Sequence, residues 1–336
     1  MQRKDLYKIF KLKIDLPELI KIAKQQNIQL QPFLEENTTL TEACVIYLYL
    51  LTGFNYLDLI HTKNQVYIYN LVRISTTNFD IFKFCEHVFD QNQIMEIALG
   101  LMNEVDVDIY NTETFNDAQM RAIRLGLKNG LDVSIYADPK FNNHQMEQIL
   151  LGLEDNLNVK IYAKSQYNWM QMNEIRLGLL DNLDVSIYAK PEYNWNQMKE
   201  IRFGLKERLD VSIYTNPKYD DMQMQQIRKG LEKGVDVSIY ADPNFSNSLM
   251  DLICDALQRN IDISIGLNPE FDEEQKYEII WGLIEGLDVS ICAKPEYDWK
   301  QMDEILMGLK KNIDVSLYNS PELDWKEMYK IRKCIR

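Results

Sequence analysis

The sequence predicts an all-α protein, an α-helical solenoid made of stacked repeats. Three observations support this fold class: the chain repeats itself every 26 residues, every repeat carries a helix-start signature, and most repeats carry a helix-stop signature at one fixed place. Each repeat would hold one long helix and one short helix, the latter either α or 3-10. An α/β horseshoe like that of leucine-rich repeats is the alternative, because the short segment also suits a strand.

The repeats align without a gap over residues 89–336, as nine 26-residue units and a C-terminal half-unit. We call the residues that occupy the same position in successive repeats a column. An aromatic column sets the register of the repeats: Phe89, Phe115, Phe141, Tyr167, Tyr193, Tyr219, Phe245, Phe271 and Tyr297. Residues 63–88 form a degenerate repeat, and residues 1–62 a divergent helical N-terminal cap in which Asp15 starts a helix. Terminal units of a stack differ in sequence because one of their faces meets water.

The long helix begins directly after the aromatic column. The next residue is Asp, Asn or Ser in every unit, among them Asn142, Asn168 and Asn194, and these residues are preferred helix N-caps. Three positions later stands Gln or Glu, and this residue completes a capping box; Leu249 is the one exception. The following position is mostly Met and can pair with the aromatic residue as a hydrophobic staple.

The body and the end of the long helix follow from the next columns. Met120, Ile123 and Leu127 lie on one helical stripe, and Gly126 beside it predicts a close approach of neighbouring helices. The stop column holds residues that tolerate a left-handed backbone: Gly130, Asn156, Asn182, Gly234, Asn260, Gly286 and Asn312. Glu104 and Arg208 depart from this rule, which predicts looser helix ends in their two units.

The short segment, residues 132–137 in one unit, is the ambiguous part of the repeat. Val133 and Ile135 alternate with Ser134 as in a strand, whereas Asp132 as an N-cap, followed by Val133 and Tyr136, suits one helical turn. The same cap column includes Asp132, Asp184, Asp210 and Asp236.

A resemblance favours the helix. The matching positions are Gly130, Leu131, Val133, Tyr136, Ala137, Pro139, Phe141, Gln145 and Met146. In these positions the units resemble a family of bacterial tandem repeats, often found on mobile elements and without an assigned activity, whose longer variants look helical in this segment. The resemblance covers residues 89–336, lacks three residues between the cap and Val133, and implies no functional residues.

The repeated aspartates could alternatively be metal ligands. Packed helices place equivalent residues on the order of 10 Å apart, whereas calcium ligands converge to about 2.5 Å from one ion. One carboxylate per repeat therefore cannot form a coordination shell. We expect structural caps and no metal site.

Composition restricts the classes of function. The net charge of -14 disfavours binding to the negatively charged phosphate backbone, so a nucleic-acid partner is not expected. Five widely spaced cysteines without a C-x-x-C pair indicate reduced thiols. The sequence starts without a signal peptide, and its most apolar stretch, residues 43–51, is too short to span a membrane. A cytoplasmic location is expected.

No catalytic constellation stands out. The three histidines, His61, His87 and His144, do not recur with the repeat, and the common phosphate-loop, nucleophile-elbow and zinc-protease motifs are absent from the sequence. We expect no catalytic residue and no cofactor. An enzyme with an unrecognised site in residues 1–88 remains as an alternative.

Two variable columns are candidates for binding a partner. The first helical position holds Trp169, Trp195, Trp299 and Trp325 in some units and polar residues in others, so the column is at least partly exposed. These tryptophans are either a protein-binding hot spot or locally matched packing. A second column holds Arg176, Arg202 and Arg228, which either grip an anionic partner or pair with Asp or Glu of the next unit.

The resulting hypothesis is a non-catalytic solenoid that binds a protein partner, with the acidic body favouring a partner with a basic surface. A more specific version, which follows from the resemblance, is an inhibitor or adaptor acting on a nucleic-acid enzyme or a host defence protein. The alternative binding function is a repeat-type single-stranded nucleic-acid binder, which needs more complete basic and aromatic columns.

Overall fold

A computed structural model describes residues 15–25, 27–34, 36, 43, 46, 47 and 89–335. It confirms an all-α repeat architecture in which long α-helices alternate with short 3-10 helices, and these residues contain no β-strand. The horseshoe alternative is therefore not supported. The elements are α2 (Leu16–Gln25), η1 (Gln31–Phe33), α7 (Gln91–Met102), η2 (Val107–Ile109), α8 (Asp117–Lys128), η3 (Val133–Ile135), α9 (Asn143–Glu154), η4 (Val159–Ile161), α10 (Trp169–Leu180), η5 (Val185–Ile187), α11 (Trp195–Lys206), η6 (Val211–Ile213), α12 (Asp221–Glu232), η7 (Val237–Ile239), α13 (Asn247–Gln258), α14 (Glu273–Ile284), η8 (Val289–Ile291), α15 (Trp299–Lys310), η9 (Val315–Leu317) and α16 (Trp325–Cys334).

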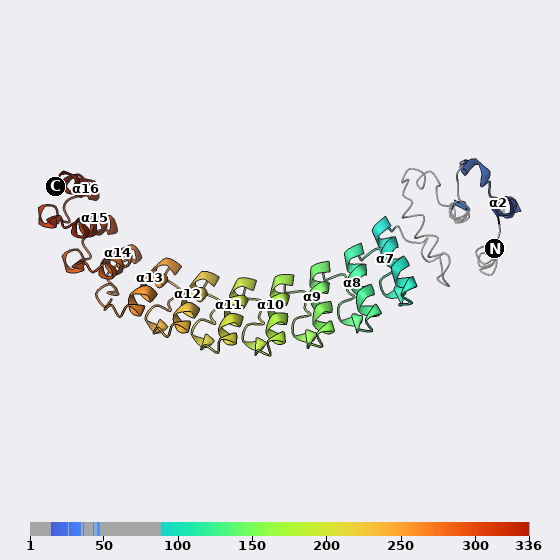
Figure 1. Cartoon of the computed structure of the whole chain (residues 1–336), viewed down its shortest axis with the longest axis horizontal. Coiled ribbons are helices and arrows are strands. Elements are labelled where there is room, and N and C mark those ends of the chain that lie inside the picture. The colour runs from blue at the N-terminus through green and yellow to red at the C-terminus, as the bar shows by residue number, and fades with distance from the viewer. Residues whose placement is uncertain are drawn as a thin grey trace. The chain divides into compact units, whose positions relative to one another are not determined.

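The chain forms two compact units, residues 1–172 and residues 173–336. In the first unit α7, α8 and α9 pack side by side in succession, and in the second α11 to α16 do so (Figure 1). Most of the predicted cap, residues 1–62, and the whole of the degenerate repeat, residues 63–88, lie outside the described residues. Where the cap is described, α2 starts after Asp15, whose carboxylate accepts a hydrogen bond from the Glu18 N–H at 3.0 Å.

Capping boxes start the long helices. In α9 the Asn142 side chain accepts from the Gln145 N–H at 2.9 Å, and the Gln145 side-chain oxygen accepts from the Asn142 N–H at 2.8 Å. The amide nitrogen of Gln145 also donates to the Tyr167 carbonyl of the next repeat at 2.6 Å. The same bond recurs 22 residues along from Gln93, Gln119, Gln197, Gln223, Gln275 and Gln301. In these repeats the capping glutamine therefore also joins one repeat to the next.

Ser246 shows how a broken capping box is replaced. Leu249 cannot accept the bond from the Ser246 N–H, but Glu273 of the next repeat accepts it at 2.8 Å. Glu273 stands in the column that holds tryptophan in other repeats. A polar residue in that column can therefore bridge neighbouring repeats.

The short 3-10 helices are capped by the repeated aspartates. Asp132, Asp184, Asp210 and Asp236 each accept the backbone N–H two residues later. After η3, the buried Tyr136 hydroxyl donates to the Ala122 carbonyl at 3.0 Å and so ties the short segment to the long helix of its own repeat.

The recurring glycine makes room for this short segment, a role that the sequence did not indicate. At Gly282 an added Cβ atom would also lie 2.9 Å from a Leu306 methyl carbon of α15, so the expected close approach of neighbouring long helices occurs there. A Cβ atom on Gly126 would lie 2.1 Å from the Tyr136 hydroxyl and 2.8 Å from a Val133 methyl carbon. In one repeat both residues of this contact are changed together: Ala256 replaces the glycine, and Gly266 replaces the tyrosine. The short segment of that repeat is a turn instead of a 3-10 helix. Absence of a side chain at 266 leaves room for the alanine.

The stop column adopts a left-handed backbone throughout residues 104–312, with φ between 54° and 71°. The expected looser ends at Glu104 and Arg208 do not occur: both residues have the same left-handed conformation, and the following N–H groups bond to Gly100 and Gly204 carbonyls at 3.1 Å and 2.9 Å. Contacts between the short segment and the helix hold the ends in place, although a residue with a Cβ is strained there.

Arg208→Gly is therefore expected to stabilise the protein by about 0.5–1 kcal/mol, because glycine adopts this conformation without the Cβ penalty. Arg208 is exposed, so little packing is lost. The midpoint of urea unfolding is the measurement. Gly234→Arg, the reverse change at an equivalent position with φ of 70°, should lower the midpoint by a similar amount. Equal midpoints for all three proteins would contradict the argument.

Asn111 carries a buried side-chain oxygen without a hydrogen-bond partner. In the equivalent place of the second unit, the Tyr297 hydroxyl bonds to Asn319 Oδ1 at 2.6 Å. Phe89 occupies the tyrosine position for Asn111, so the hydroxyl is missing there.

Phe89→Tyr should therefore stabilise the protein by about 1 kcal/mol, since a buried polar atom gains its hydrogen bond. Tyr297→Phe should destabilise it by a similar amount, because Asn319 loses its donor. Thermal unfolding of both variants measures the two shifts. Shifts of the same sign would show that the hydroxyl does not act through these asparagines.

Candidate interaction surface

Four arginines of the column form ion pairs that are buried or, for Arg228, partly buried. The Nε atoms of Arg124, Arg202, Arg228 and Arg332 bond to Glu96, Glu174, Glu200 and Glu304 at 2.6–2.8 Å. Each glutamate stands 28 residues earlier, so the partner belongs to the preceding repeat. The sequence-based expectation of a partner in the next repeat was therefore wrong. These guanidinium groups hold adjacent repeats together.

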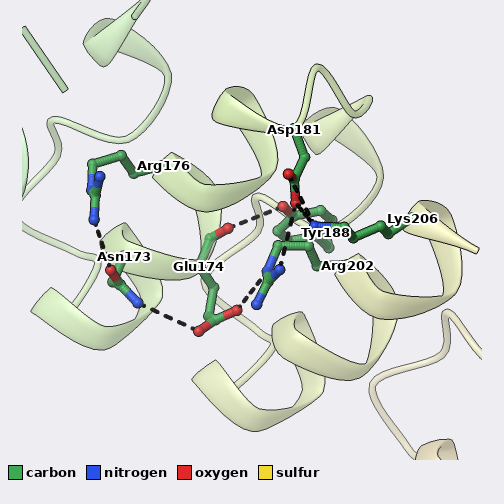
Figure 2. A network of polar contacts seen from close by, with 7 residues as sticks. All are labelled: Asn173, Glu174, Arg176, Asp181, Tyr188, Arg202 and Lys206. Atoms are coloured by element: carbon green, nitrogen blue, oxygen red, sulfur yellow. Dashed lines mark hydrogen bonds and ion pairs between the residues drawn. The ribbon is translucent and has the colours of Figure 1, made fainter. Parts of the chain in front are cut away.

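Figure 2 shows this network around Glu174 in the second unit. Arg202 bonds to Glu174 at 2.8 Å and approaches Asp181 at 3.8 Å, while Lys206 pairs with Asp181 at 3.0 Å. The Tyr188 hydroxyl donates to the Glu174 carbonyl at 3.1 Å. Arg176, which is partly buried, donates to the Asn173 side chain at 3.3 Å.

The aspartate column does not converge on any point. Asp132, Asp184, Asp210 and Asp236 are engaged as caps, and the N-cap residues Asn142, Asn168 and Asn194 accept bonds from Gln145, Gln171 and Gln197. Among residues 15–47 as far as described and 89–335, no group of three His, Cys, Asp or Glu side chains could hold a metal ion. The alternative of an enzyme site in residues 1–88 falls mostly outside the described residues.

The tryptophan column lies at the surface. Trp169 in the first unit and Trp299 in the second are 38% and 40% exposed, and Trp195 and Trp325 are partly buried. Trp169 packs against His144, with ring centroids 5.6 Å apart. Trp169 therefore combines contact with the preceding repeat and an exposed aromatic face.

Lysines interleave with the tryptophans of α15 and α16. The Lys300 ammonium lies 5.3 Å from the Trp299 ring centroid and 5.4 Å from that of Trp325, and Lys326 lies 5.7 Å from Trp325. We refer to Trp299, Lys300, Trp325 and Lys326 as the Trp–Lys row. Cation–π contacts of this kind hold both rings in position while leaving aromatic surface in contact with water.

Glu278 on α14 is the exception in the glutamate column. The equivalent arginine position of the next repeat holds Leu306, and position 292, where other repeats have the tyrosine that bonds to the glutamate carbonyl, holds Cys292. Within the described residues Glu278 forms no ion pair or side-chain hydrogen bond. Burial, together with the charge of Asp303 on α15, raises the pKa of Glu278 to about 7.

This site should make stability depend on pH. The raised pKa means that folded protein holds the Glu278 proton more tightly than unfolded protein does, so stability is lost as pH rises from about 4.5 towards 7 and is constant above. Asp303 and the buried Cys292 thiol are the titratable groups that face Glu278.

Glu278→Gln is therefore expected to be more stable than the wild type at pH 8 by about 1–2 kcal/mol, after allowance for solvent screening of a partly exposed group. At pH 5 the two proteins should unfold at nearly the same urea concentration. Glu322→Gln, which removes an exposed carboxylate, is the control. An equal effect of Glu278→Gln at both pH values would contradict the assignment.

Sequence reasoning identified the arginines and tryptophans but missed the glutamate column and Glu278. The sequence does contain a sign of the glutamate column, because residues 28 positions apart often match in chemical type. Four such pairs are Glu with Arg, and two are apolar: Ala122 with Leu150 and Leu252 with Ile280. A comparison of residues 28 positions apart, in addition to the repeat period of 26, shows that the charged Glu278 stands opposite the apolar Leu306.

Comparison with known proteins gives no further constraint, since no protein-family model, curated protein or solved structure matches the chain. In the part of the chain that the structure describes, none of the helices has the length and apolar character needed to cross a membrane.

Proposed function

We propose that this chain is a non-catalytic interaction protein whose solenoid surface binds a protein partner with a basic surface. The Trp–Lys row is the observation that carries the proposal. Trp299 is 40% exposed at the start of α15, and the neighbouring Trp325 is held beside it by Lys300. Pre-positioned aromatic side chains with exposed rings are typical hot spots of protein interfaces.

The fold supports this function by its rigidity. Buried ion pairs, capping glutamines and tyrosine hydroxyls join successive elements, so a column on the long helices keeps a regular spacing within each unit. Repeat proteins use such regular surfaces to bind extended partners. The net charge of -14 favours a partner of opposite charge.

Affinity capture with the full chain tests the proposal. The test variant replaces Trp169, Trp195, Trp299 and Trp325 with alanine. A matched variant removes exposed apolar side chains elsewhere, with alanine at Met102, Leu180, Met222 and Leu317. We expect the wild type and the matched variant to retain one partner and the tryptophan variant to lose it. Retention of the same partner by the tryptophan variant would contradict the proposal.

The more specific proposal is an inhibitor or adaptor that acts on a nucleic-acid enzyme or a host defence protein. It rests on the resemblance of the repeats to the bacterial mobile-element family and on the acidic charge. An acidic inhibitor that replaces a phosphate backbone should lose affinity steeply as salt is raised. A captured partner whose binding does not change with salt would contradict this version.

A gel shift with labelled single-stranded DNA and RNA at low salt separates the rival binding function. Lys300 and the flanking tryptophans could stack and neutralise a nucleotide strand. The exposed carboxylates of Glu296 and Glu322 close to them in sequence, and the charge of the whole chain, oppose a phosphate backbone. We expect no shift, and a shift lost in the tryptophan variant would replace the protein-binding proposal.

A further inference from the structure

Exposed aromatic residues occur on α14, α15 and α16 on both sides of one carboxylate. Tyr277, Asp303 and Tyr329 occupy the same position in three successive repeats, and the two tyrosines are 38% and 43% exposed. Trp299 and Trp325 lie one helical turn before Asp303 and Tyr329, hence on the same helix face. The helices pack in this order (Figure 1), so Asp303 lies on an aromatic surface.

Glu278 adds a second carboxylate to this surface. The pairing of the other glutamates in its column places it opposite Leu306, which lies one helical turn after Asp303 on α15, and its charge interacts with that of Asp303. Burial is the main cause that raises the pKa of Glu278, followed by Asp303. Two neighbouring carboxylates of like charge are unfavourable, and a guest cation would stabilise both. Arg332, the cation that lowers the pKa of Asp303, is already bonded to Glu304.

The chain itself shows which cation suits this position. Four other glutamates of the column bind an arginine Nε of the following repeat at 2.6–2.8 Å. Leu306 removes that arginine only opposite Glu278, because the remaining members of the glutamate column are not glutamate (Ala122, Gln148, Gln226, Leu252 and Lys330). The Glu278 site is therefore a repeat ion pair that lacks its arginine.

We propose that the surface formed by Tyr277, Glu278, Trp299, Asp303 and Tyr329 binds an arginine side chain of the protein partner. The inference rests on the proposed function and specifies the partner's chemistry. The guanidinium would supply the donors that Leu306 cannot, with Glu278 and Asp303 as acceptors. Arginine suits the site better than lysine because its planar group donates to two carboxylates and stacks on aromatic rings.

The surrounding charge favours a basic segment around that arginine. Residues 236–288 contain twelve Asp and Glu against two Lys and Arg. Asp262, Glu270 and Glu285 in this stretch are exposed. A field of this sign concentrates basic peptides near α14 and accelerates their association.

Fluorescence anisotropy with short labelled peptides tests the inference on the full chain. The probe is a Gly/Ser peptide with two arginines, and the matched probes carry lysine or citrulline, the neutral isostere of arginine, at the same places. We expect the arginine peptide to bind more tightly than the lysine peptide, the citrulline peptide to bind at least tenfold more weakly, and the affinity for arginine to rise from pH 6 to pH 8.

Two variants locate the binding. Leu306→Arg supplies the missing arginine from within the chain, so it should raise the melting temperature at pH 8 and weaken arginine-peptide binding at least tenfold. Glu278→Gln should weaken binding by a similar factor without adding a cation, which keeps the test valid if Leu306→Arg folds poorly. Glu322→Gln is the control for loss of one exposed negative charge and should bind like the wild type.

Equal binding of the arginine and citrulline peptides, wild-type affinity of folded Leu306→Arg and Glu278→Gln, or no detectable binding would each overturn the inference. These outcomes are separate from the proposed function. Tryptophan-dependent capture of a partner that Glu278→Gln still retains would support the interaction surface while removing the arginine site from it.

Discussion

Gly178→Ala is expected to destabilise the protein by about 3 kcal/mol, at the upper end of the usual cost of overpacking a core. A Cβ atom at this position would lie 1.9 Å from the Tyr188 hydroxyl and 2.8 Å from a Val185 methyl carbon. Tyr188 is fully buried and its hydroxyl bonds to the Glu174 carbonyl, so the ring cannot move aside without losing that bond. The gain in helix propensity from glycine to alanine, about 1 kcal/mol, offsets only part of the loss.

A double-mutant cycle identifies the cause. Tyr188→Phe removes the nearest atom, so Gly178→Ala should cost at least about 1 kcal/mol less in that background than in the wild type. Ala256→Gly is the control from within the chain, because Gly266 leaves no ring beside it. It should destabilise the protein by only about 1 kcal/mol, the propensity difference. Urea unfolding measures all five proteins, and additive effects in the cycle would exclude the hydroxyl as the cause.

Local rules were sufficient to predict the long helices. The capping box at Asn142 and Gln145 and the stop at Gly130 involve residues a few positions apart, so their spacing in the sequence already fixes their geometry. The period of 26 then places the same elements in every repeat. The 3-10 helix at Val133–Ile135 was harder, because its three residues carry no periodicity that separates a turn from a strand.

Contacts between elements could not be derived in the same way. The roles of Gly126 and Tyr136 depend on how the chain folds back after the stop residue, and spacing alone does not determine that path. Arg208 shows that a local rule can also mislead. The conformational preference of arginine predicts a loose helix end, but the packed segments on either side impose the left-handed backbone. Tertiary contacts outweigh a local preference of about 1 kcal/mol.

The candidate surface was only half predictable for the same reason. The irregular Trp column is visible in the sequence, and its partial exposure follows from the polar residues that share it. The arginines were ambiguous because an exposed ridge and a buried ion pair require the same residue type. Their partners lie in the preceding repeat, at an offset slightly longer than the repeat period, and the packing of the helices is what brings the two side chains together.

Glu174→Ala is the second change with a large expected effect, a loss of about 3–5 kcal/mol, because it leaves a buried charge without its partner. The Glu174 and Arg202 side chains are 7% and 9% exposed, and their bond measures 2.8 Å (Figure 2). Asp181 lies 3.8 Å from the guanidinium and is itself paired with Lys206, so it cannot replace Glu174. The free energy of unfolding from urea titration is the measurement.

The chain also contains the control for this prediction. Ala122 and Leu150 occupy the same two columns in the first unit, are both buried, and replace the charged pair with apolar side chains. Copying this solution as Glu174→Ala with Arg202→Leu should restore stability to within about 1 kcal/mol of the wild type, since a buried ion pair contributes little net stability over a well-packed apolar pair.

A double variant no more stable than Glu174→Ala alone would show that the ion pair itself adds net stability to the stack, whereas costs that simply add would show that the two side chains are not coupled. A rescued double variant would instead assign the pairs a role in register. The Glu and Arg of a pair satisfy each other only when successive helices are correctly aligned, so a slipped alignment leaves both charges buried and unpaired. Apolar pairs impose no such penalty, which explains how the chain can alternate between the two without changing its fold.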